Sequence, residues 1–194
     1  MAPRIFAAAA FGLALLAGCS AGAPEQPPPP IVGLDTAPEA AKTLPPTAKG
    51  PLTGAIVLVD AGHAGVYDKE RSGKLTSTNG LQVPCYTAGA QAVDGTGEHT
   101  LNFDLAKRTA AALRARGATV MLTRADDASF GPCNDERAAV ANTTKADAVV
   151  ALHADSDGAD KRGFHVIYAA KMAGGKQVQT ASKTFAERMA AALK

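Results

Sequence analysis

Two short apolar runs, each leading directly to a histidine, constrain the fold of this chain more than any other feature. Residues 56–59, Ile-Val-Leu-Val, lead through Asp60 to His63, and residues 148–152, Ala-Val-Val-Ala-Leu, lead to His153. Apolar runs rich in β-branched residues that do not alternate with polar ones are typical of strands buried on both faces, as in parallel sheets. We therefore expect both histidines at the carboxyl edge of one sheet, where open α/β sheets bind their ligands.

The remaining patterns from residue 55 onward predict the other elements of an α/β domain. Leu101, Leu105 and Leu113 recur at helical spacing, and Gly117 follows as a stop signal. Residues 118–123 predict a second strand, so that strand, helix and strand form a right-handed parallel unit. Three further elements are expected: a helix capped by Asn134 or Asp135 that runs to about residue 143, a strand at 163–169, and a helix that opens at Thr180 or Ser182 and carries an apolar stripe including Phe185 and Leu193. We predict one α/β domain with a twisted, mainly parallel sheet flanked by helices.

The first 54 residues are expected to lie outside this domain. Residues 1–23 resemble a secretory signal, because Arg4 precedes an apolar run that is too short to span a bilayer. Two cleavage sites remain open: a lipobox ending at Cys19, which would carry a lipid anchor, and a small-residue site at 21–23. Residues 24–54 are rich in proline and poor in large apolar residues, which predicts a linker. The chain is thus expected to be exported to the periplasm or cell envelope, either free or lipid-anchored, with its folded domain at 55–194.

Export determines how the cysteines are interpreted. Without Cys19, the chain has one pair, Cys85 and Cys133. In an oxidising compartment these two are expected to form a disulfide, although two buried thiols are the alternative. Such a bridge would close a loop of about fifty residues and contribute on the order of 4 kcal/mol in the chain-entropy model.

Composition excludes some classes of function. The formal net charge is +2, there is no basic cluster and there is no tryptophan, so neither a nucleic-acid surface nor an aromatic stacking platform is expected. The Gly-Gly-Lys run at 174–176 lacks both the upstream glycine and the following Ser or Thr of a P-loop, which argues against nucleotide binding. We expect a monomer.

A metal site is the most specific functional prediction. Glu98 opens the predicted helix between the two histidine-bearing strands, so His63, Glu98 and His153 can meet. Two histidines and one carboxylate with an open fourth position form a catalytic zinc set. Taken singly, each histidine could instead be a hydrogen-bonded core residue, and Glu98 could simply stabilise the first turn of its helix.

Other polar residues near the predicted site have alternative roles. Arg124 could bind the carboxylate of a peptide, or form a structural ion pair with Asp126, Asp127 or Asp135. Asp60 and Asp155 could orient the histidine rings through their second nitrogens. His99 is expected to be exposed, and His165 lies in the middle of a predicted strand. The long polar segment 64–97 is either a wall or lid of the site, a plain surface loop, or the location of an unrecognised hairpin.

The order of these motifs resembles that of the zinc-dependent N-acetylmuramoyl-L-alanine amidases, which cut bacterial peptidoglycan. The resemblance covers residues 55 to about 190 and rests on a set of short motifs: Asp-Ala-Gly-His at 60–63, Gly-Glu at 97–98, Leu-Thr-Arg at 122–124, Arg137 with Ala-Asn at 141–142, Ala-Asp-Ala at 146–148 and Leu-His-Ala-Asp at 152–155. It implies that His63, Glu98 and His153 hold one zinc ion. It also implies that the bond cut is the amide between the lactyl group of N-acetylmuramic acid and L-alanine, in peptidoglycan or muropeptides.

Two departures from the family pattern qualify this expectation. Ala61 stands where the family usually has proline, which concerns the turn and not the ligand. The family's catalytic glutamate, on a strand after the last helix, has no counterpart here, so the catalytic residue is unassigned and the domain is expected to be incomplete at its C-terminus. We expect Glu187, beside Arg188, to be a solvated surface carboxylate. We therefore expect zinc binding with slow cleavage, and two alternatives remain open: a non-catalytic cell-wall binding or regulatory module, and a zinc carboxypeptidase on wall peptides.

Overall fold

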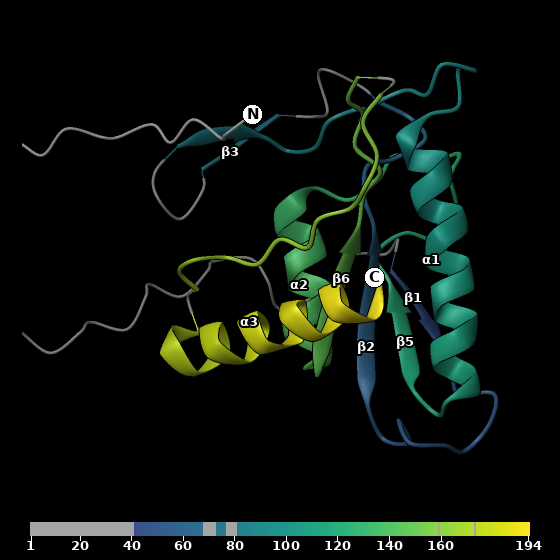
Figure 1. The fold of residues 1–194 in the computed structure, drawn as a ribbon, viewed down its shortest axis with the longest axis vertical. Coiled ribbons are helices and arrows are strands. Elements are labelled where there is room, and N and C mark those ends of the chain that lie inside the picture. The colour runs from purple at the N-terminus through teal and green to yellow at the C-terminus, as the bar shows by residue number, and fades with distance from the viewer. Residues whose placement is uncertain (1–40, 68–72, 77–80, 159, 173) are drawn as a thin grey trace, which may run out of the picture. The chain divides into compact units, whose positions relative to one another are not determined.

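The computed structural model describes residues 41–67, 73–76, 81–158, 160–172 and 174–194 (Figure 1). The expected signal peptide, Cys19 and the first part of the expected linker lie outside these residues. The elements, in chain order, are β1 (Lys42–Leu44), β2 (Ile56–Ala61), β3 (Lys74–Thr76), β4 (Gln82–Pro84), α1 (Glu98–Ala115), β5 (Thr119–Leu122), α2 (Asn134–Thr144), β6 (Ala148–Leu152) and α3 (Gly175–Ala192).

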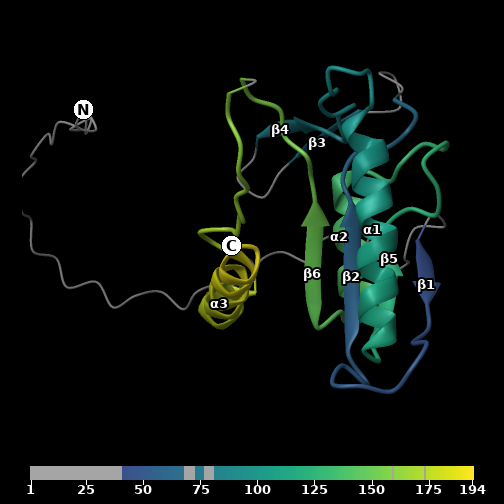
Figure 2. The same cartoon turned by 45° about the vertical axis from the view of Figure 1, so that its right-hand side comes forward.

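Four of the strands form one mixed sheet in the order β1-β5-β2-β6 (Figure 2). β2 lies in the interior and pairs in parallel with β5 on one side and with β6 on the other. β1 adds an antiparallel strand beyond β5. The register pairs Ala61 with Leu152, so the ends of β2 and β6 lie side by side and the residues that follow them emerge at the same edge. This confirms a mainly parallel α/β sheet.

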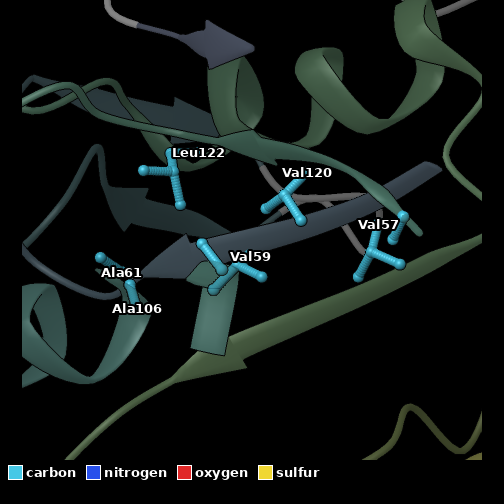
Figure 3. Packing of buried hydrophobic residues seen from close by; sticks show 8 residues of the cluster. Val57, Val59, Ala61, Ala106, Val120 and Leu122 are labelled. Carbon is cyan, nitrogen blue, oxygen red and sulfur yellow. The ribbon is translucent and has the colours of Figure 1, made fainter. Parts of the chain in front are cut away.

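Side chains of β2 point alternately to the two faces of the sheet, and each face has its own hydrophobic core. Val57, Val59 and Ala61 pack on one face with Ala106 and Ala110 of α1 and with residues of β5 (Figure 3). Leu58 points to the other face, where it packs with Met121 and with Val140 of α2. α1 and α2 therefore cover opposite faces, and the apolar run of β2 is buried on both sides, as its composition predicts.

Several expected boundaries are confirmed, and others are corrected. α1 begins at Glu98 and ends just before Gly117, whose φ of 101° suits a glycine after a helix. α2 starts at Asn134, with Cys133 as its N-cap in place of the expected Asn134 or Asp135. β1 lies inside the 24–54 segment that we expected to be a linker. The sequence of this short strand gives little signal, because pairing with β5 is what stabilises it.

The expected strand at 163–169 is absent from the structure, although all seven residues are described. Alternating apolar residues favour a strand only where a neighbouring strand accepts their hydrogen bonds, and this segment pairs with none in the described part of the chain. α3 begins at Gly175, earlier than Thr180. Its expected apolar stripe is largely exposed, including Phe185 and Leu193, while Ala186 is buried.

Segment 64–97 contains a hairpin, which was one of the alternatives that the sequence left open. β3 and β4 pair antiparallel, and residues 77–80 between them lie outside the described part. Directly after β4, Cys85 forms a disulfide with Cys133, the N-cap residue of α2, as expected. Cys85 and Tyr86 are buried with Ala64 in a small third core. Among the described helices, none combines the length and the apolar character needed to cross a membrane.

Candidate metal centre

Three potential ligands meet at the carboxyl edge of the sheet. One donor atom each from His63, Glu98 and His153 lies within 4.8 Å of the other two. The Nε2 atom of His63 is 3.0 Å from one carboxylate oxygen of Glu98, and the Nδ1 atom of His153 is 3.0 Å from the other. The two ring nitrogens are 3.2 Å apart. The structure thus brings together the three residues that the sequence singled out.

His63 is held in an unusual backbone conformation by its surroundings. Its φ of 63° lies in the left-handed region, which few residues other than glycine adopt. Its Nδ1–H donates a hydrogen bond of 2.9 Å to the carbonyl oxygen of Thr87. When the ring is neutral, that bond leaves the lone pair of Nε2 facing the carboxylate of Glu98. Two electron-pair donors in contact require a cation between them, either a proton or a metal ion.

Glu98 is buried and remains ionised. Burial raises the pKa of its carboxyl group, but the backbone N–H groups of Ala90 and Ala154, the side-chain amide of Asn102 and the charge of His63 together outweigh burial and lower the pKa from 4.5 to about 2. The two backbone donors lie 2.8 and 3.0 Å from the carboxylate oxygens. A carboxylate fixed by three donors is preorganised as a metal ligand at neutral pH.

Two glycines allow the chain to approach these ligands closely. A Cβ atom on Gly62 would lie 2.3 Å from the ring of His153, and one on Gly89 would lie 2.8 Å from the ring of His63 and 2.9 Å from the carboxylate of Glu98. Gly89 also has a φ of 83°. Side chains at either position would displace the ligands, so both glycines are required by close approach.

A buried arginine clamps the turn that follows β2. The guanidinium of Arg137 donates to Asp60 at 2.5 Å, to the carbonyl oxygen of Ala61 at 3.0 Å and to that of His63 at 2.8 Å. Arg124 adds a second bond of 3.0 Å to the carbonyl oxygen of Ala61. Four charge-assisted bonds therefore hold residues 60–63, the segment that presents His63.

His63 and His153 border a pocket of about 190 Å³. Its walls come from the end of β2, the start of α2 and the residues after the hairpin, and consist of Asp60, Gly62, His63, Tyr86, Thr87, Asn134, Arg137 and His153. Segment 64–97 therefore contributes a wall of the site through Tyr86 and Thr87. Both histidines and the polar lining make this pocket suited to a hydrated, polar substrate.

Arg124 and Asp60, for which the sequence allowed a role in the site, form structural ion pairs and hydrogen bonds. Arg124 forms an ion pair of 2.7 Å with Asp127, the structural alternative. Asp60 binds Arg137 and Thr123 instead of a histidine ring, because the carbonyl oxygen of Thr87 occupies the second nitrogen of His63.

The remaining predictions concern polar residues outside the metal centre. His99, expected to be exposed, is half-buried and bonded to Asp127 at 2.8 Å. His165 is exposed and does not line the pocket. Asp155 accepts a bond from the backbone of Ser156, and no described bond joins it to His153. Glu187 is exposed and pairs with Lys183, as expected of a surface carboxylate.

Sequence patterns missed the groups that orient the ligands. Asn102 follows Glu98 by four residues, so helical spacing alone places the two on one face and could have identified it. The backbone groups of Thr87, Ala90 and Ala154 leave no such signal, because every residue except proline carries the same N–H and every residue the same carbonyl.

Comparisons with known proteins agree with this geometry. Residues 57–194 match the family model Amidase_3, described as N-acetylmuramoyl-L-alanine amidase. The chain is 39% identical over 119 residues to the N-acetylmuramoyl-L-alanine amidase Rv3717 of Mycobacterium tuberculosis, an alignment that covers 61% of this chain and 49% of the relative. The matched part of the chain therefore spans about half the length of that relative.

Two solved structures are also similar. The N-acetylmuramyl-L-alanine amidase Ami1 of Mycobacterium smegmatis has a TM-score of 0.66 and 36% identity, with 70% of this chain and 62% of that one covered. The apo form of Ami1 from Mycobacterium abscessus has a TM-score of 0.59 and 33% identity, with 68% and 64% covered. The family model spans most of the chain and includes all three residues of the candidate metal centre, and the chain accordingly belongs to the N-acetylmuramoyl-L-alanine amidase family.

Proposed function

We propose that this protein hydrolyses the amide bond between the lactyl group of N-acetylmuramic acid and L-alanine in peptidoglycan or its fragments, with one zinc ion held by His63, Glu98 and His153. The observation that carries the proposal is the convergence of these three donor atoms within 4.8 Å, at the edge of a pocket, in a chain of this family.

The donor set suits zinc in type, charge and spacing. Imidazole nitrogens and a carboxylate oxygen are common zinc ligands, and three of them leave a fourth position open. Two ligands of a tetrahedral zinc ion lie about 3.3 Å apart when each is 2.0–2.1 Å from the metal. Nε2 of His63 and Nδ1 of His153 are 3.2 Å apart, which is close to that value, and each lies 3.0 Å from a different oxygen of Glu98.

A bound zinc ion supplies Lewis acidity, which polarises an amide carbonyl and lowers the pKa of a coordinated water to about 7. The chain's own residues hold the ligands and shape the pocket. Asp60 is the carboxylate among the residues that line the pocket, and its Oδ1 atom accepts hydrogen bonds from Thr123 and Arg137. These bonds give Asp60 a role in positioning the turn that presents His63.

The proposal includes export to the cell envelope, as a monomer. The Cys85–Cys133 disulfide supports an oxidising compartment. A polymeric peptidoglycan substrate would also lie outside the cytoplasm. Residues 1–23 would be the export signal, with Cys19 as the site of a lipid anchor in the lipoprotein alternative. Residues 24–54 would connect the anchor to the domain and contribute β1 to it.

The decisive experiment identifies the product formed from a disaccharide-peptide muropeptide in the presence of zinc. An amidase releases the intact peptide with a free L-alanine amino group, which mass spectrometry distinguishes from the single amino acid released by a carboxypeptidase. His63→Ala is the matched control and should form neither product. Zinc and muropeptide binding without cleavage would contradict the amidase proposal and support a binding module.

Elemental mass spectrometry of the purified protein tests the metal separately. We expect about one zinc per chain, and loss of that zinc in His63→Ala. A folded protein that takes up no zinc would contradict the metal centre itself.

A further inference from the structure

The residues that follow the hairpin connect the disulfide to the metal centre. Residues 85–90, here called the strap, begin at Cys85, which is bonded to Cys133 with the two Cα atoms 4.7 Å apart. The N–H of Asn134 also donates to the carbonyl oxygen of Cys85 at 2.9 Å. The start of the strap is thus attached to the first turn of α2, and Cys85 and Tyr86 are buried there.

The middle and end of the strap hold two of the three proposed ligands. The carbonyl oxygen of Thr87 accepts the Nδ1–H of His63 at 2.9 Å, which directs Nε2 toward the metal position. The N–H of Ala90 donates to Glu98 at 2.8 Å, and the N–H of Glu98 donates back to the carbonyl oxygen of Ala90 at 2.9 Å. Gly89 passes between these contacts, without room for a Cβ atom.

The start of the strap has further contacts. The N–H of Cys85 donates to the carbonyl oxygen of Gly73, and buried Tyr86 packs against Ala64 and donates from its hydroxyl to the carbonyl oxygen of Val66 at 3.5 Å. Thr87, residue 88 and Gly89 are exposed, so packing does little to fix them. The disulfide at Cys85 is thus the covalent part of the anchor from which the Thr87 carbonyl, two residues away, is positioned.

We propose that the Cys85–Cys133 disulfide is a positioning element of the metal centre: it fixes the strap, and the strap orients His63 and Glu98 for metal binding. The inference rests on the metal site of the proposed function and is independent of the reaction that the site performs. Groups that orient metal ligands typically contribute 10- to 100-fold to metal affinity, which sets the size of the expected effect.

The test compares zinc affinity among variants of the full chain, by competition with a chromophoric chelator. Cys85→Ala combined with Cys133→Ala removes the bridge and should weaken zinc binding 10- to 100-fold. Val140→Ala is the control for general destabilisation, because it opens the core between α2 and the sheet without touching the strap, and its zinc affinity should stay within about twofold of the wild type.

Two glycines provide a second comparison with the disulfide intact. Gly89→Ala places a methyl group against His63 and Glu98, whereas Gly95→Ala imposes a similar backbone strain, at a φ of 87°, with no atom within 4 Å. We expect Gly89→Ala to lose at least tenfold in zinc affinity and Gly95→Ala to lose less than threefold. This pair tests the strap as a positioning segment. If the double cysteine variant fails to fold, the same zinc competition on wild type whose disulfide has been reduced with a phosphine tests the bridge, and unchanged affinity of that folded, reduced protein would overturn the inference.

A readout without metal separates this inference from the proposed function. In the zinc-free protein, NMR should show a proton on Nδ1 of His63 that is hydrogen-bonded to the carbonyl oxygen of Thr87 in the wild type, and loss of this bond in the cysteine variant. If the wild type bound no zinc, the proposed function would fail, and this hydrogen bond would still test the strap. A folded cysteine variant with unchanged zinc affinity and an unchanged hydrogen bond would overturn the inference.

Discussion

The ends of β2 and β6 carry the same kind of sequence but are supported very differently. Both strands are apolar and both lead to a proposed ligand. β2 has a neighbour on each side and Val59 is fully buried, whereas β6 is the last strand of the described sheet and Val149 is 48% exposed. The side chain of His63 is 13% exposed and that of His153 is 52% exposed.

The difference continues in the hydrogen bonds beyond each strand. Arg124 and Arg137 bind the carbonyl groups after β2, and Thr87 orients the ring of His63. After β6, the ring of His153 and the N–H of Ala154 both bond to Glu98, and the carbonyl oxygen of Leu152 accepts the N–H of Gly62. One histidine is therefore preorganised by its own turn, while the other depends on Glu98.

The largest expected effect comes from removing the clamp after β2. Arg137→Ala would leave the largely buried carboxylate of Asp60 without its charged partner, and breaking such a pair costs about 3–5 kcal/mol. Arg108→Ala removes an exposed arginine paired with Asp104 and should change stability by less than about 1 kcal/mol. Urea unfolding of both variants measures the difference. Equal losses would show that Asp60 is not held as the structure indicates.

The second prediction concerns acid, through the residue that links the two strand ends. The folded-state pKa of Glu98 is lowered to about 2, so its ionised form stabilises the folded protein above pH 4.5, and this contribution is lost as the pH falls toward 2. The metal-free wild type should lose about 3 kcal/mol from this group in that window. Glu98→Gln should remove that part of the slope, and parallel pH profiles for the two proteins would refute the assignment.

A third prediction compares the two strands directly. Val59→Ala opens a space in the core beside α1 and should lower the free energy of unfolding by about 2 kcal/mol. Val149→Ala lies on an exposed surface of β6 and should change it by less than about 0.5 kcal/mol. Thermal or urea unfolding tests the pair. A loss of about 2 kcal/mol in Val149→Ala would mean that β6 is covered in solution.

The smallest effect is expected from the histidines in the absence of metal. His63→Ala loses the bond to the carbonyl oxygen of Thr87 and should cost about 1 kcal/mol. His153→Ala should cost less than about 0.5 kcal/mol, because its side chain is half-exposed. Calorimetry with a chelator present checks this order, and adding zinc should raise the melting temperature of the wild type alone. A reversed order would contradict the comparison of the two turns.

Sequence patterns predicted the elements that carry their own periodicity. The runs in β2, β5 and β6 and the helical spacing in α1 gave strands and a helix within a few residues of the observed bounds. They failed at β1 and at 163–169, since the existence of a short strand depends on whether a partner is available. The disulfide was predictable because Cys19 lies in the expected export signal, so that Cys85 and Cys133 were the pair expected in the folded domain.

The sequence by itself determined which side chains could form the metal centre, because the parallel pairing of two apolar strands delivers His63 and His153 to one edge and the helix start adds Glu98. Only the tertiary structure decided how those ligands are held. The carbonyl oxygen of Thr87 and the N–H groups of Ala90 and Ala154 come from distant segments. Backbone groups are chemically alike along the chain, so their role depends on position in space and not on residue type.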